Sequence, residues 1–382
     1  MKAVISKISF CNIINKIQSI VATKPAIPIL SNVLIEAIDD QLILSATDLT
    51  TSMKCSCEAK VIEAGGIALP AKKFFQLIKE LTSSQIKIST SNEIAEIISG
   101  SSLFKINGIN KSLFPTISNF SGSIQIQLNS SLLREMLYRT HFSASRDDSR
   151  LTLNGISLTI KNQKAIFIST DGKRLSKIDC KVDIDPSFQG CYIIPLKAVE
   201  EIIKILSESQ NDAILGLQPD KIFLENDNTI LTTKLLSGRY PNTEKVIPKN
   251  IKTKITFHRE ELIALLRQIS LFTEDTSSSI CFIFEKGTLH LIANTKEIGE
   301  GNVSMPIDYD GEELKIAFNP FFLLDILKHS KDETIYFSLN DSYNPGMVSD
   351  STSAIFVMMP MRLHKNYNTD NTIDDSKEII FT

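Results

Sequence analysis

The stretch IALPAKKFFQLIKEL, from Ile67 to Leu81, decides the fold because its pattern occurs twice more along the chain. It returns as YIIPLKAVEEIIKIL, from Tyr192 to Leu206, and as IAFNPFFLLDILKHS, from Ile316 to Ser330. Each copy ends an apolar strand, breaks, and continues as a helix with apolar residues four, seven and eight positions after the break. The breaks are at Pro70, Pro195 and Asn319. Their spacing of about 124 residues is that of a small domain, so the sequence predicts three copies of one domain.

A second marker keeps almost the same spacing. Asp48, Asp171 and Asn294 each end a predicted strand and follow one another by 123 residues. Asp and Asn both stabilise turns through their side chains, whereas acid–base chemistry would need a carboxylate in every copy. We therefore interpret these residues as turn residues of the repeat and not as catalytic groups.

Each predicted domain begins with its own helix. Ser6, Asn129 and His258 stand just before an apolar spacing typical of one helix face, and Ser and Asn are favoured at that capping position. Hairpins join the strands between the helices, which predicts an α+β fold of antiparallel sheets with two helices per domain. The predicted hairpin turns are Asp39–Asp40, Lys161–Asn162 and Lys286–Gly287. The predicted domains are residues 1–122, 123–250 and 251–363.

Composition is that of an ordinary globular protein. The 382 residues are 42% hydrophobic and 22% charged, with a net charge of -3. No apolar run is long enough to span a membrane, and the first residues lack the apolar core of an export signal, so we expect a cytoplasmic protein. The six cysteines show no zinc spacing, so we expect buried, reduced thiols and no metal site.

The repeated helices have one apolar and one basic face. In the helix after Pro70, the predicted core face is Phe74, Leu77, Ile78 and Leu81, and the opposite face is Lys72, Gln76 and Lys79. Comparable outward positions in the other helices are Lys16, Arg134, Lys197, Lys204, Arg267 and Lys328, with acids at Glu201 and Asp325. A solvated face is the simpler interpretation for one helix. Six such helices lining a closed ring would instead present cations to the phosphates of a duplex.

Motifs of catalysis are not found. The sequence contains no phosphate-binding glycine loop, no nucleophile elbow and no H-E-x-x-H. The acids Asp147 and Asp148 in SRDDSR are typical of a salt-bridged loop. Two alternatives stay open: a phosphate-handling group of Asp171, Lys173 and Arg174, and a scaffold that never encircles DNA. The methionines of FVMMPMRL, from Phe356 to Leu363, suit either a core or an adaptable binding surface.

Seven segments resemble, in order, the bacterial sliding clamp family, the beta subunit of DNA polymerase III. They are KPAIPILSNVLIEA (24–37), ATDL (46–49), LPAKKFF (69–75), RLTLNGI (150–156), STDGKRLSK (169–177), GRYPNTEKVIPK (238–249) and MPMRL (359–363). The resemblance implies a non-catalytic, head-to-tail homodimer that forms a six-domain ring around duplex DNA and gives the polymerase processivity. It implies as partners the polymerase III alpha subunit, a clamp loader, and other polymerases and repair proteins that carry clamp-binding peptides.

The resemblance also implies three sets of site residues. A partner-peptide pocket would be formed by Leu153, Thr170, Gly172, Arg174, Leu175, Pro241, Val246, Val357, Met358, Met359, Pro360, Met361 and Arg362. DNA would be bound by Lys24, Lys72, Arg150, Lys197 and Lys245. The dimer interface would join Phe104 and Ile106 to Leu271, Phe272 and the strand near Gly299–Val303.

The chain departs from the family pattern at a few places. Leu151 and Thr152 stand where family members often have an aromatic residue after the arginine, so a stacking contact with DNA is not expected there. Residues 364–382 extend past the usual family end, and their polar composition predicts a disordered tail. The terminal EIIF of this tail, Glu378–Phe381, could fold back onto the pocket.

Overall fold

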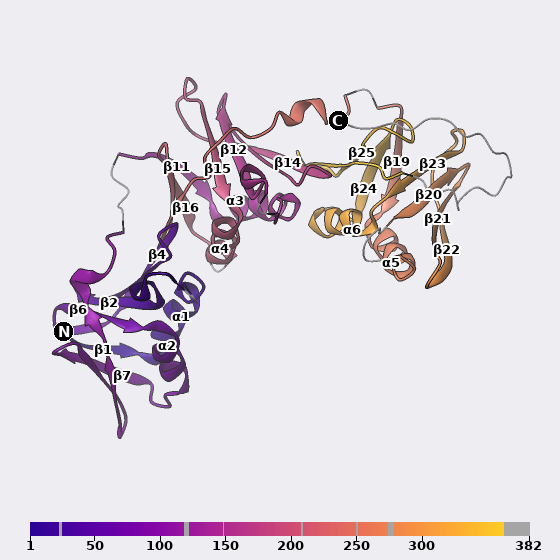
Figure 1. Ribbon diagram of the computed structural model, residues 1–382. Helices are drawn as coiled ribbons and strands as arrows, with labels where there is room; N and C mark the ends of the chain where they lie inside the picture. Colours follow the sequence, from indigo (N-terminus) through magenta and orange to yellow (C-terminus); the bar gives the residue numbers. More distant parts are fainter. Residues whose placement is uncertain are drawn as a thin grey trace. The chain divides into compact units, whose positions relative to one another are not determined.

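The computed structural model describes residues 1–22, 25–117, 122–147, 149–207, 209–249, 251–273 and 279–362. The chain divides into two compact units (Figure 1). The first unit is Met1–Asp171 with Ile178–Tyr240, and the second is Gly172–Lys177 with the described residues from Pro241 onward. The first unit therefore holds the first two repeats except Gly172–Lys177, and the second unit holds that segment and the third repeat. The predicted tail, 364–382, lies outside the described residues.

The first repeat packs two helices against two sheets. Its helices are α1 (Lys7–Ile17) and α2 (Ala71–Glu80). Its strands are β1 (Lys2–Ser6), β2 (Asn32–Ile38), β3 (Gln41–Thr47), β4 (Thr51–Glu58), β5 (Lys60–Glu63), β6 (Gly65–Pro70), β7 (Gln85–Ser91), β8 (Ile94–Ser99), β9 (Ser102–Asn107) and β10 (Ile109–Asn110). The rings of Phe10 on α1 and Phe74 on α2 meet edge to face with centroids 5.6 Å apart, which fixes the helix pair over the core.

The second repeat has the same order of elements. Its helices are α3 (Ser130–Tyr138) and α4 (Leu196–Ser207). Its strands are β11 (Ile124–Asn129), β12 (Gly155–Lys161), β13 (Lys164–Thr170), β14 (Arg174–Lys181), β15 (Gly190–Pro195), β16 (Asp212–Leu217), β17 (Lys221–Asn226) and β18 (Thr229–Lys234). The Asn129 side chain accepts from the amides of Ser131 and Leu132, so the predicted N-cap of α3 is confirmed.

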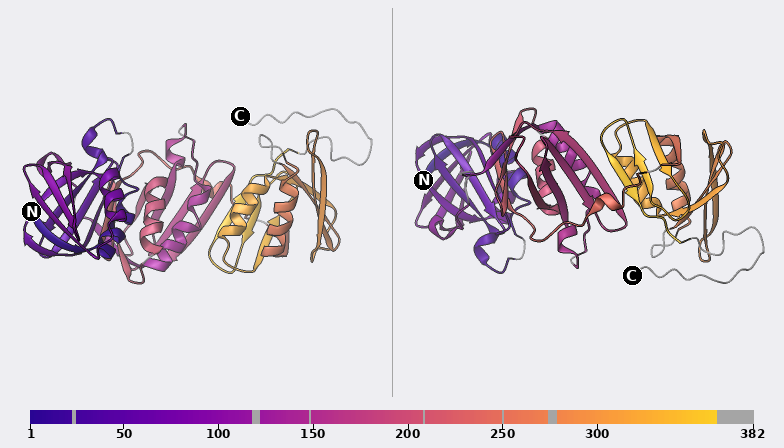
Figure 2. Two further views of the ribbon diagram at one scale, coloured as in Figure 1. Left: turned by 90° about the horizontal axis from the view of Figure 1, so that it is seen from below. Right: turned by 90° about the horizontal axis from the view of Figure 1, so that it is seen from above.

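The third repeat forms the second unit. Its helices are α5 (Arg259–Ser270) and α6 (Pro320–His329), which lie side by side in Figures 1 and 2. Its strands are β19 (Thr253–His258), β20 (Ile280–Glu285), β21 (Thr288–Thr295), β22 (Gly299–Pro306), β23 (Leu314–Phe318), β24 (Thr334–Leu339), β25 (Gly346–Ser349) and β26 (Ile355–Met358). Buried rings of Phe282, Phe318 and Phe337 form its centre, with the Phe282–Phe318 and Phe318–Phe337 centroids each 5.6 Å apart.

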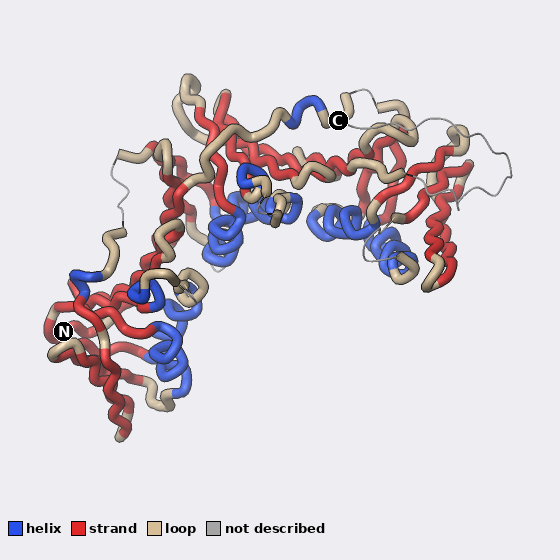
Figure 3. Tube along the Cα trace, viewed as in Figure 1, coloured by secondary structure: helices blue, strands red, loops and turns tan. Residues whose placement is uncertain are grey.

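The sheets are antiparallel, as the sequence predicts. In the first unit a five-stranded sheet has the order β5-β1-β7-β8-β9, and a nine-stranded sheet has the order β10-β6-β2-β3-β4-β18-β17-β16-β11. The second sheet crosses from one repeat to the next through the pair β4–β18, where Met53 lies opposite Leu231. Figure 3 shows the helices of each repeat packed beside its strands. The α+β prediction with two helices per repeat is confirmed for the described residues.

The structure has one predicted hairpin turn in its expected place and another shifted by one residue. The β2–β3 turn is at Asp39 and Asp40, which both have positive φ, as predicted. The β12–β13 turn is at Asn162 and Gln163 and not at Lys161–Asn162, because Lys161 still pairs with Lys164 in the ladder. A two-residue turn of this type needs positive φ at both positions.

Several predicted side-chain environments are wrong. Leu77 is only half-buried, whereas Phe75 is buried because its ring lies beside that of Phe74, with centroids 6.0 Å apart. Asn294 lies inside β21, opposite Glu300, and does not end its strand. Glu201 is not on a solvated face: it is 6% exposed because Ser19 Oγ, at 2.6 Å, and Lys204 Nζ, at 2.8 Å, satisfy its carboxylate.

The cysteines are not all buried, which gives a direct chemical test of the fold. Cys191 is exposed on β15, whereas Cys57 and Cys281 are buried. Burial raises the pKa of the Cys57 thiol to about 12, helped by neighbouring Cys55, and burial raises the pKa of Cys281 to about 11. At pH 8 a thiol of pKa 11 is a thiolate in only about one part in a thousand of molecules.

We expect a disulfide-exchange reagent at pH 8 to modify Cys191 rapidly, and Cys57 and Cys281 only when the chain unfolds. Mass spectrometry of proteolytic peptides over a time course measures this order. Cys191→Ser should remove the fast phase. Fast modification of Cys281 in the native protein would contradict this account of its burial.

Candidate functional site

The last strand of the second unit anchors the methionine segment. β26 pairs with the first residues of β14, with Arg174 opposite Met358 and Leu175 opposite Val357. Val357, Met358 and Leu175 are at most 3% exposed. The core interpretation therefore holds for Met358, and these three side chains can support a pocket from behind but offer little surface to a ligand.

The residues after β26 are held by their backbones. The Met359 amide donates to the Lys173 carbonyl at 2.9 Å, and the Met361 amide donates to the Ala317 carbonyl at 2.7 Å. Met359 is 40% exposed, while Pro360 and Met361 are half-buried. These two backbone hydrogen bonds hold Met359 and Met361 in place at the surface.

Arg174 has a structural role inside the second unit. Its guanidinium lies 2.8 Å from the Asp325 carboxylate and stacks over the Phe322 ring, 4.6 Å from the centroid. Both partners are on α6, so Arg174 ties β14 to that helix. Gly172, two residues earlier, is exposed and has a φ of +89°, a conformation that favours glycine.

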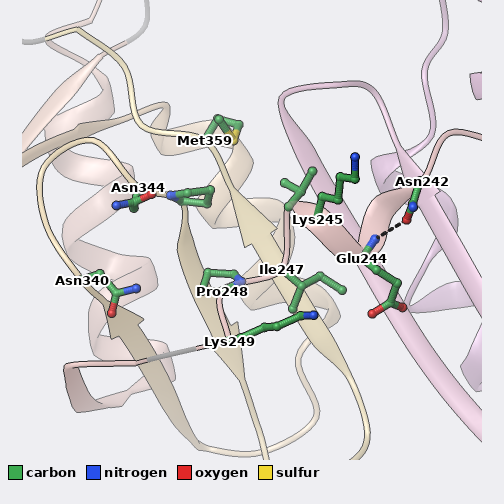
Figure 4. Close-up of a pocket in the computed structure, with 11 residues that line it drawn as sticks. Asn242, Glu244, Lys245, Ile247, Pro248, Lys249, Asn340, Asn344 and Met359 are labelled. Carbon is green, nitrogen blue, oxygen red and sulfur yellow. Dashed lines mark hydrogen bonds between the residues drawn. The ribbon is translucent and has the colours of Figure 1, made fainter.

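A cavity of about 840 Å³ lies beside Met359 in the second unit (Figure 4). One wall is the segment 242–249 and the other is the loop that begins at Asn340. It shares Val246 and Met359 with the predicted pocket and Lys245 with the predicted DNA contacts. The lining residues that the sequence reasoning missed are Asn242, Glu244, Ile247, Pro248, Lys249, Asn340, Asn344 and Pro345.

Local hydrogen bonds shape both walls of this cavity. The Asn242 side chain accepts from the Glu244 amide at 3.2 Å, and the Glu244 carboxylate pairs with Lys177 at 2.6 Å (Figure 4 draws the first bond). On the other wall Asp341 accepts from the amides of Tyr343 and Asn344, each at 2.8 Å. These bonds also lower the pKa of Asp341, against the opposing effect of burial. Such side-chain turns were a visible sequence signal in PNTEK and NDSYN.

Two predicted pocket residues belong to the first unit. Leu153 and Thr170 are both nearly buried there, and the Thr170 amide donates to the Tyr240 hydroxyl at 3.0 Å. Burial raises the pKa of the Tyr240 phenol, so it stays protonated. Pro241 and Arg362 are exposed residues of the second unit.

The predicted DNA-binding cations differ in their exposure and in whether an acid pairs with them. Lys72 on α2 and Arg150 are exposed in the first unit, Lys245 is exposed in the second, and Lys24 lies outside the described residues. Lys197 on α4 is 2.5 Å from the Asp48 carboxylate, which also accepts from the amides of Thr50 and Thr51. The Asp48 turn prediction is therefore confirmed, and the same carboxylate also pairs with a cation of the second repeat.

Burial of Asp48 opposes its ionisation, but Lys197 and the two amides outweigh burial and hold its pKa below the ordinary value of 3.8. The carboxylate is thus ionised at neutral pH. Two other helix cations are also matched by acids: Lys204 by Glu201 at 2.8 Å and Lys328 by Asp325 at 3.8 Å. The helix faces are consequently less basic than a count of lysines suggests.

The predicted interface residues lie at open sheet edges. β9 ends the five-stranded sheet and carries Phe104, 37% exposed, and half-buried Ile106. β22 ends a four-stranded sheet of order β22-β21-β20-β23 in the second unit. Beside it Leu271, just past α5, is 74% exposed. An open edge with apolar side chains is a ready template for pairing with another chain.

The Phe272 ring lies close to Gly301 of β22, where an added Cβ would come within 2.9 Å of that ring.

Among the described residues no three His, Cys, Asp or Glu side chains gather in a way that would hold a metal ion. No helix in the described part of the chain combines the length and apolar content needed to cross a membrane.

Three consecutive stretches match the three domains of one protein family. Residues 1–118 match the N-terminal domain of the DNA polymerase III beta subunit, residues 127–242 its central domain and residues 244–362 its C-terminal domain. The resemblance seen in the sequence is therefore confirmed.

Relatives and solved structures agree with this match. The chain is 51% identical to the beta sliding clamp of Chlamydia pneumoniae over 365 residues, which cover 95% of this chain and 100% of that clamp. The Pseudomonas aeruginosa clamp bound to griselimycin matches with a TM-score of 0.92 at 27% identity, and the Bartonella birtlesii clamp bound to griselimycin with 0.90 at 29%. Each of these covers 95% of this chain and 100% of its own. The chain therefore belongs to the beta sliding clamp family, the DNA polymerase III beta subunits that serve as DNA sliding clamps in replication.

Proposed function

We propose that two copies of this clamp subunit close head to tail, with β9 of one copy against β22 of the other, into a ring around duplex DNA. The observation that carries the proposal is the pair of open strand edges, one in each unit, together with two exposed apolar side chains, Phe104 on β9 and Leu271 at the end of α5. An antiparallel pairing of these edges would satisfy their free backbone groups and cover both side chains. Because the two edges differ, the contact is head to tail.

The ring would contain six domains, three from each copy. We assign them to residues 1–122, 123–250 and 251–363, with 364–382 as an appended tail. The subunit acts without catalysis: it holds a polymerase near the primer end because a closed ring cannot dissociate from DNA. As a clamp on chromosomal DNA it works in the cytoplasm.

Partner proteins would dock through the surface around Met359 and Met361. Fixed backbone, exposed apolar side chains and a cavity beside Met359 suit the insertion of apolar anchors from a short peptide. The partners we propose are the polymerase III alpha subunit, the clamp loader, and other polymerases and repair proteins. The bound griselimycin in two related clamps supports ligand binding as a property of this fold.

A phosphate-handling site of Asp171, Lys173 and Arg174 is less well supported. The Arg174 guanidinium is already engaged by Asp325 and by the face of Phe322, so it is a poor anchor for a substrate phosphate. The scaffold alternative predicts protein binding without topological retention on DNA. The following experiment distinguishes it from a ring that encircles DNA.

The test is retention on circular nicked DNA after incubation with a clamp loader and ATP, followed by linearisation. Retention on the circle and loss on cutting establish encirclement. Retention on both forms would mean ordinary contact binding. Loss from the circle although partner peptides still bind would favour the scaffold.

One charge pair makes a quantitative prediction about DNA contact. Asp48→Asn should release Lys197 for a phosphate and so steepen the plot of log affinity against log salt by about 0.9. Lys72→Gln should flatten it by a similar amount, because exposed Lys72 has no such acid beside it among the described residues. Fluorescence anisotropy with a primed duplex, between about 50 and about 200 mM salt, measures both slopes.

The double variant Asp48→Asn, Lys197→Gln serves as the control and should return the slope to that of the parent or below. The depressed pKa of Asp48 means that its pairing is present at and above its ordinary pKa and is lost as the pH falls through its lower folded value. Measurement at pH 7 therefore reports the intact pair. An unchanged slope in Asp48→Asn would show that Lys197 does not contact phosphate.

A further inference from the structure

The cavity beside Met359 offers apolar surface together with uncompensated positive charge. Its apolar lining includes Val246 and Met359, which are 38% and 40% exposed. Lys245 and Lys249 line it as well, and within the described part of the chain no carboxylate pairs with either. The one acid in the lining, Glu244, pairs with Lys177. The matching ligand is a peptide with apolar side chains next to carboxylates.

Figure 4 shows how these groups are arranged. Pro248 and Ile247 lie below Asn344 and Lys245 in this view, and Met359 lies at the upper edge. Lys245 and Lys249 both belong to the 242–249 wall, and in this view their amines lie on either side of Ile247. A short extended segment can place apolar residues on the apolar lining and acids against the lysines.

The chain itself contains such a segment. DDSKEIIF, from Asp374 to Phe381, has three carboxylates followed by Ile379, Ile380 and Phe381. Within residues 363–382, four acids outnumber two lysines. The family match ends at residue 362, so this segment is an addition to the clamp domains and not a part of their core.

The segment is attached close to the cavity. Met359 lines the cavity and precedes Arg362, where the described chain ends, by three residues. The attachment point therefore lies within about 11 Å of a lining residue. The eleven residues from Leu363 to Ile373 span about 20 Å as a flexible chain and almost 40 Å when extended. A tether of this length gives an effective concentration on the order of 1 mM.

We propose that Asp374–Phe381 occupies this cavity of its own chain. Ile380 and Phe381 lie on Val246 and Met359, and Asp374 and Asp375 face Lys245 and Lys249. One consequence rests on the proposed function: because Val246 and Met359 also belong to the partner pocket, the tail competes with partner peptides. The occupation itself depends on neither DNA nor partners.

Peptide binding tests the proposal without any partner. A fluorescent peptide of residues 374–382 is titrated by anisotropy into the full chain and into the full-chain variant Ile380→Ser, Phe381→Ser. If the free peptide binds the variant with a Kd of about 100 μM, the native tail should weaken it about tenfold. A peptide carrying the same two serines is the control and should not bind. Charge reversal, Lys245→Glu with Lys249→Glu, should weaken the peptide at least about fivefold in a salt-dependent manner. Equal affinity for parent and variant would overturn the proposal.

Photo-crosslinking locates the tail. With p-benzoylphenylalanine in place of Phe381 in the full chain, irradiation should give crosslinks within one chain to Val246, Pro248 or Met359, read by mass spectrometry. Mixing isotopically heavy and light chains separates crosslinks within a chain from those between chains. Crosslinks only between chains, or only outside the cavity, would overturn the proposal. If crosslinks and peptide binding are as expected but partner peptides are insensitive to the tail, the failure lies with the proposed partner pocket.

Discussion

Leu271→Asp is expected to convert the proposed clamp dimer into monomers and to abolish its retention on circular DNA. Leu271 is 74% exposed in the isolated chain, so the substitution should leave the fold of the subunit unchanged. In the proposed ring the same side chain is buried, and a carboxylate there would be desolvated without a partner. A cost of 3 kcal/mol or more corresponds to roughly a hundredfold loss of dimer affinity. Analytical ultracentrifugation at micromolar concentration measures the dissociation.

The other edge provides a second variant and a matched control. Phe104→Asp on β9 should have the same effect, because it would contact the β22 edge of the other copy. Ile62→Asp is the control: Ile62 is also an exposed apolar residue, at 55%, but it lies on β5, the opposite edge of the same five-stranded sheet. It should remain dimeric and retained on DNA. Dissociation of Ile62→Asp together with a stable Leu271→Asp dimer would show that the interface involves the β5 edge and contradict the proposed contact between β9 and β22.

The repeat pattern predicted the fold because each helix has a local signal. Pro70 and Asn319 stop a strand and start a helix at the predicted positions, and the Asn319 side chain caps α6 by accepting from the Phe321 and Phe322 amides. Hairpins with short turns were likewise visible, as at Asp39–Asp40. Such signals act over a few residues, so one sequence is enough to reveal them.

Contacts between repeats could not be predicted in this way. The β4–β18 pair joins residues about 180 positions apart, and no local pattern indicates which edge strands meet. The same limit explains Glu201, which looked like a surface acid until Ser19 of the first repeat proved to satisfy it. Pairing of Asp48 with Lys197 is a third contact of this kind. Only this last contact neutralises a helix cation that the sequence alone presents as free.

The candidate pocket was predictable only in part, for a related reason. Residue types in FVMMPMRL suited either a core or a binding surface, and they did not indicate the alternation that buries Met358 and exposes Met359. That alternation is set by pairing of β26 with β14, a strand from the preceding repeat. The cavity wall formed by Asn340 and Pro345 was missed because the side-chain turn in NDSYN is a local signal and does not indicate which other segment the loop faces.

Met361→Ala should weaken partner-peptide binding at least about thirtyfold while the ring stays closed, since loss of a central apolar anchor costs about 2 kcal/mol or more. The half-buried side chain is shortened, but the Met361 amide still donates to Ala317, so the segment keeps its course. Isothermal titration with a polymerase-derived peptide measures the affinity, and retention on nicked circles measures the ring. Leu113→Ala, a change at an exposed apolar residue of the first unit, is the control and should affect neither.

The point variant is a sharper test than removal of the whole segment. Deletion of Met359–Leu363 should also abolish partner binding and leave the ring folded, but it removes the hydrogen bonds to Lys173 and Ala317 as well, and Leu363 lies outside the described residues. Loss of binding in the deletion could then come from a displaced β14 rather than from a missing anchor. If Met361→Ala binds the peptide like the parent, the anchor is not Met361. If the deletion does so too, the partner surface lies elsewhere on the clamp.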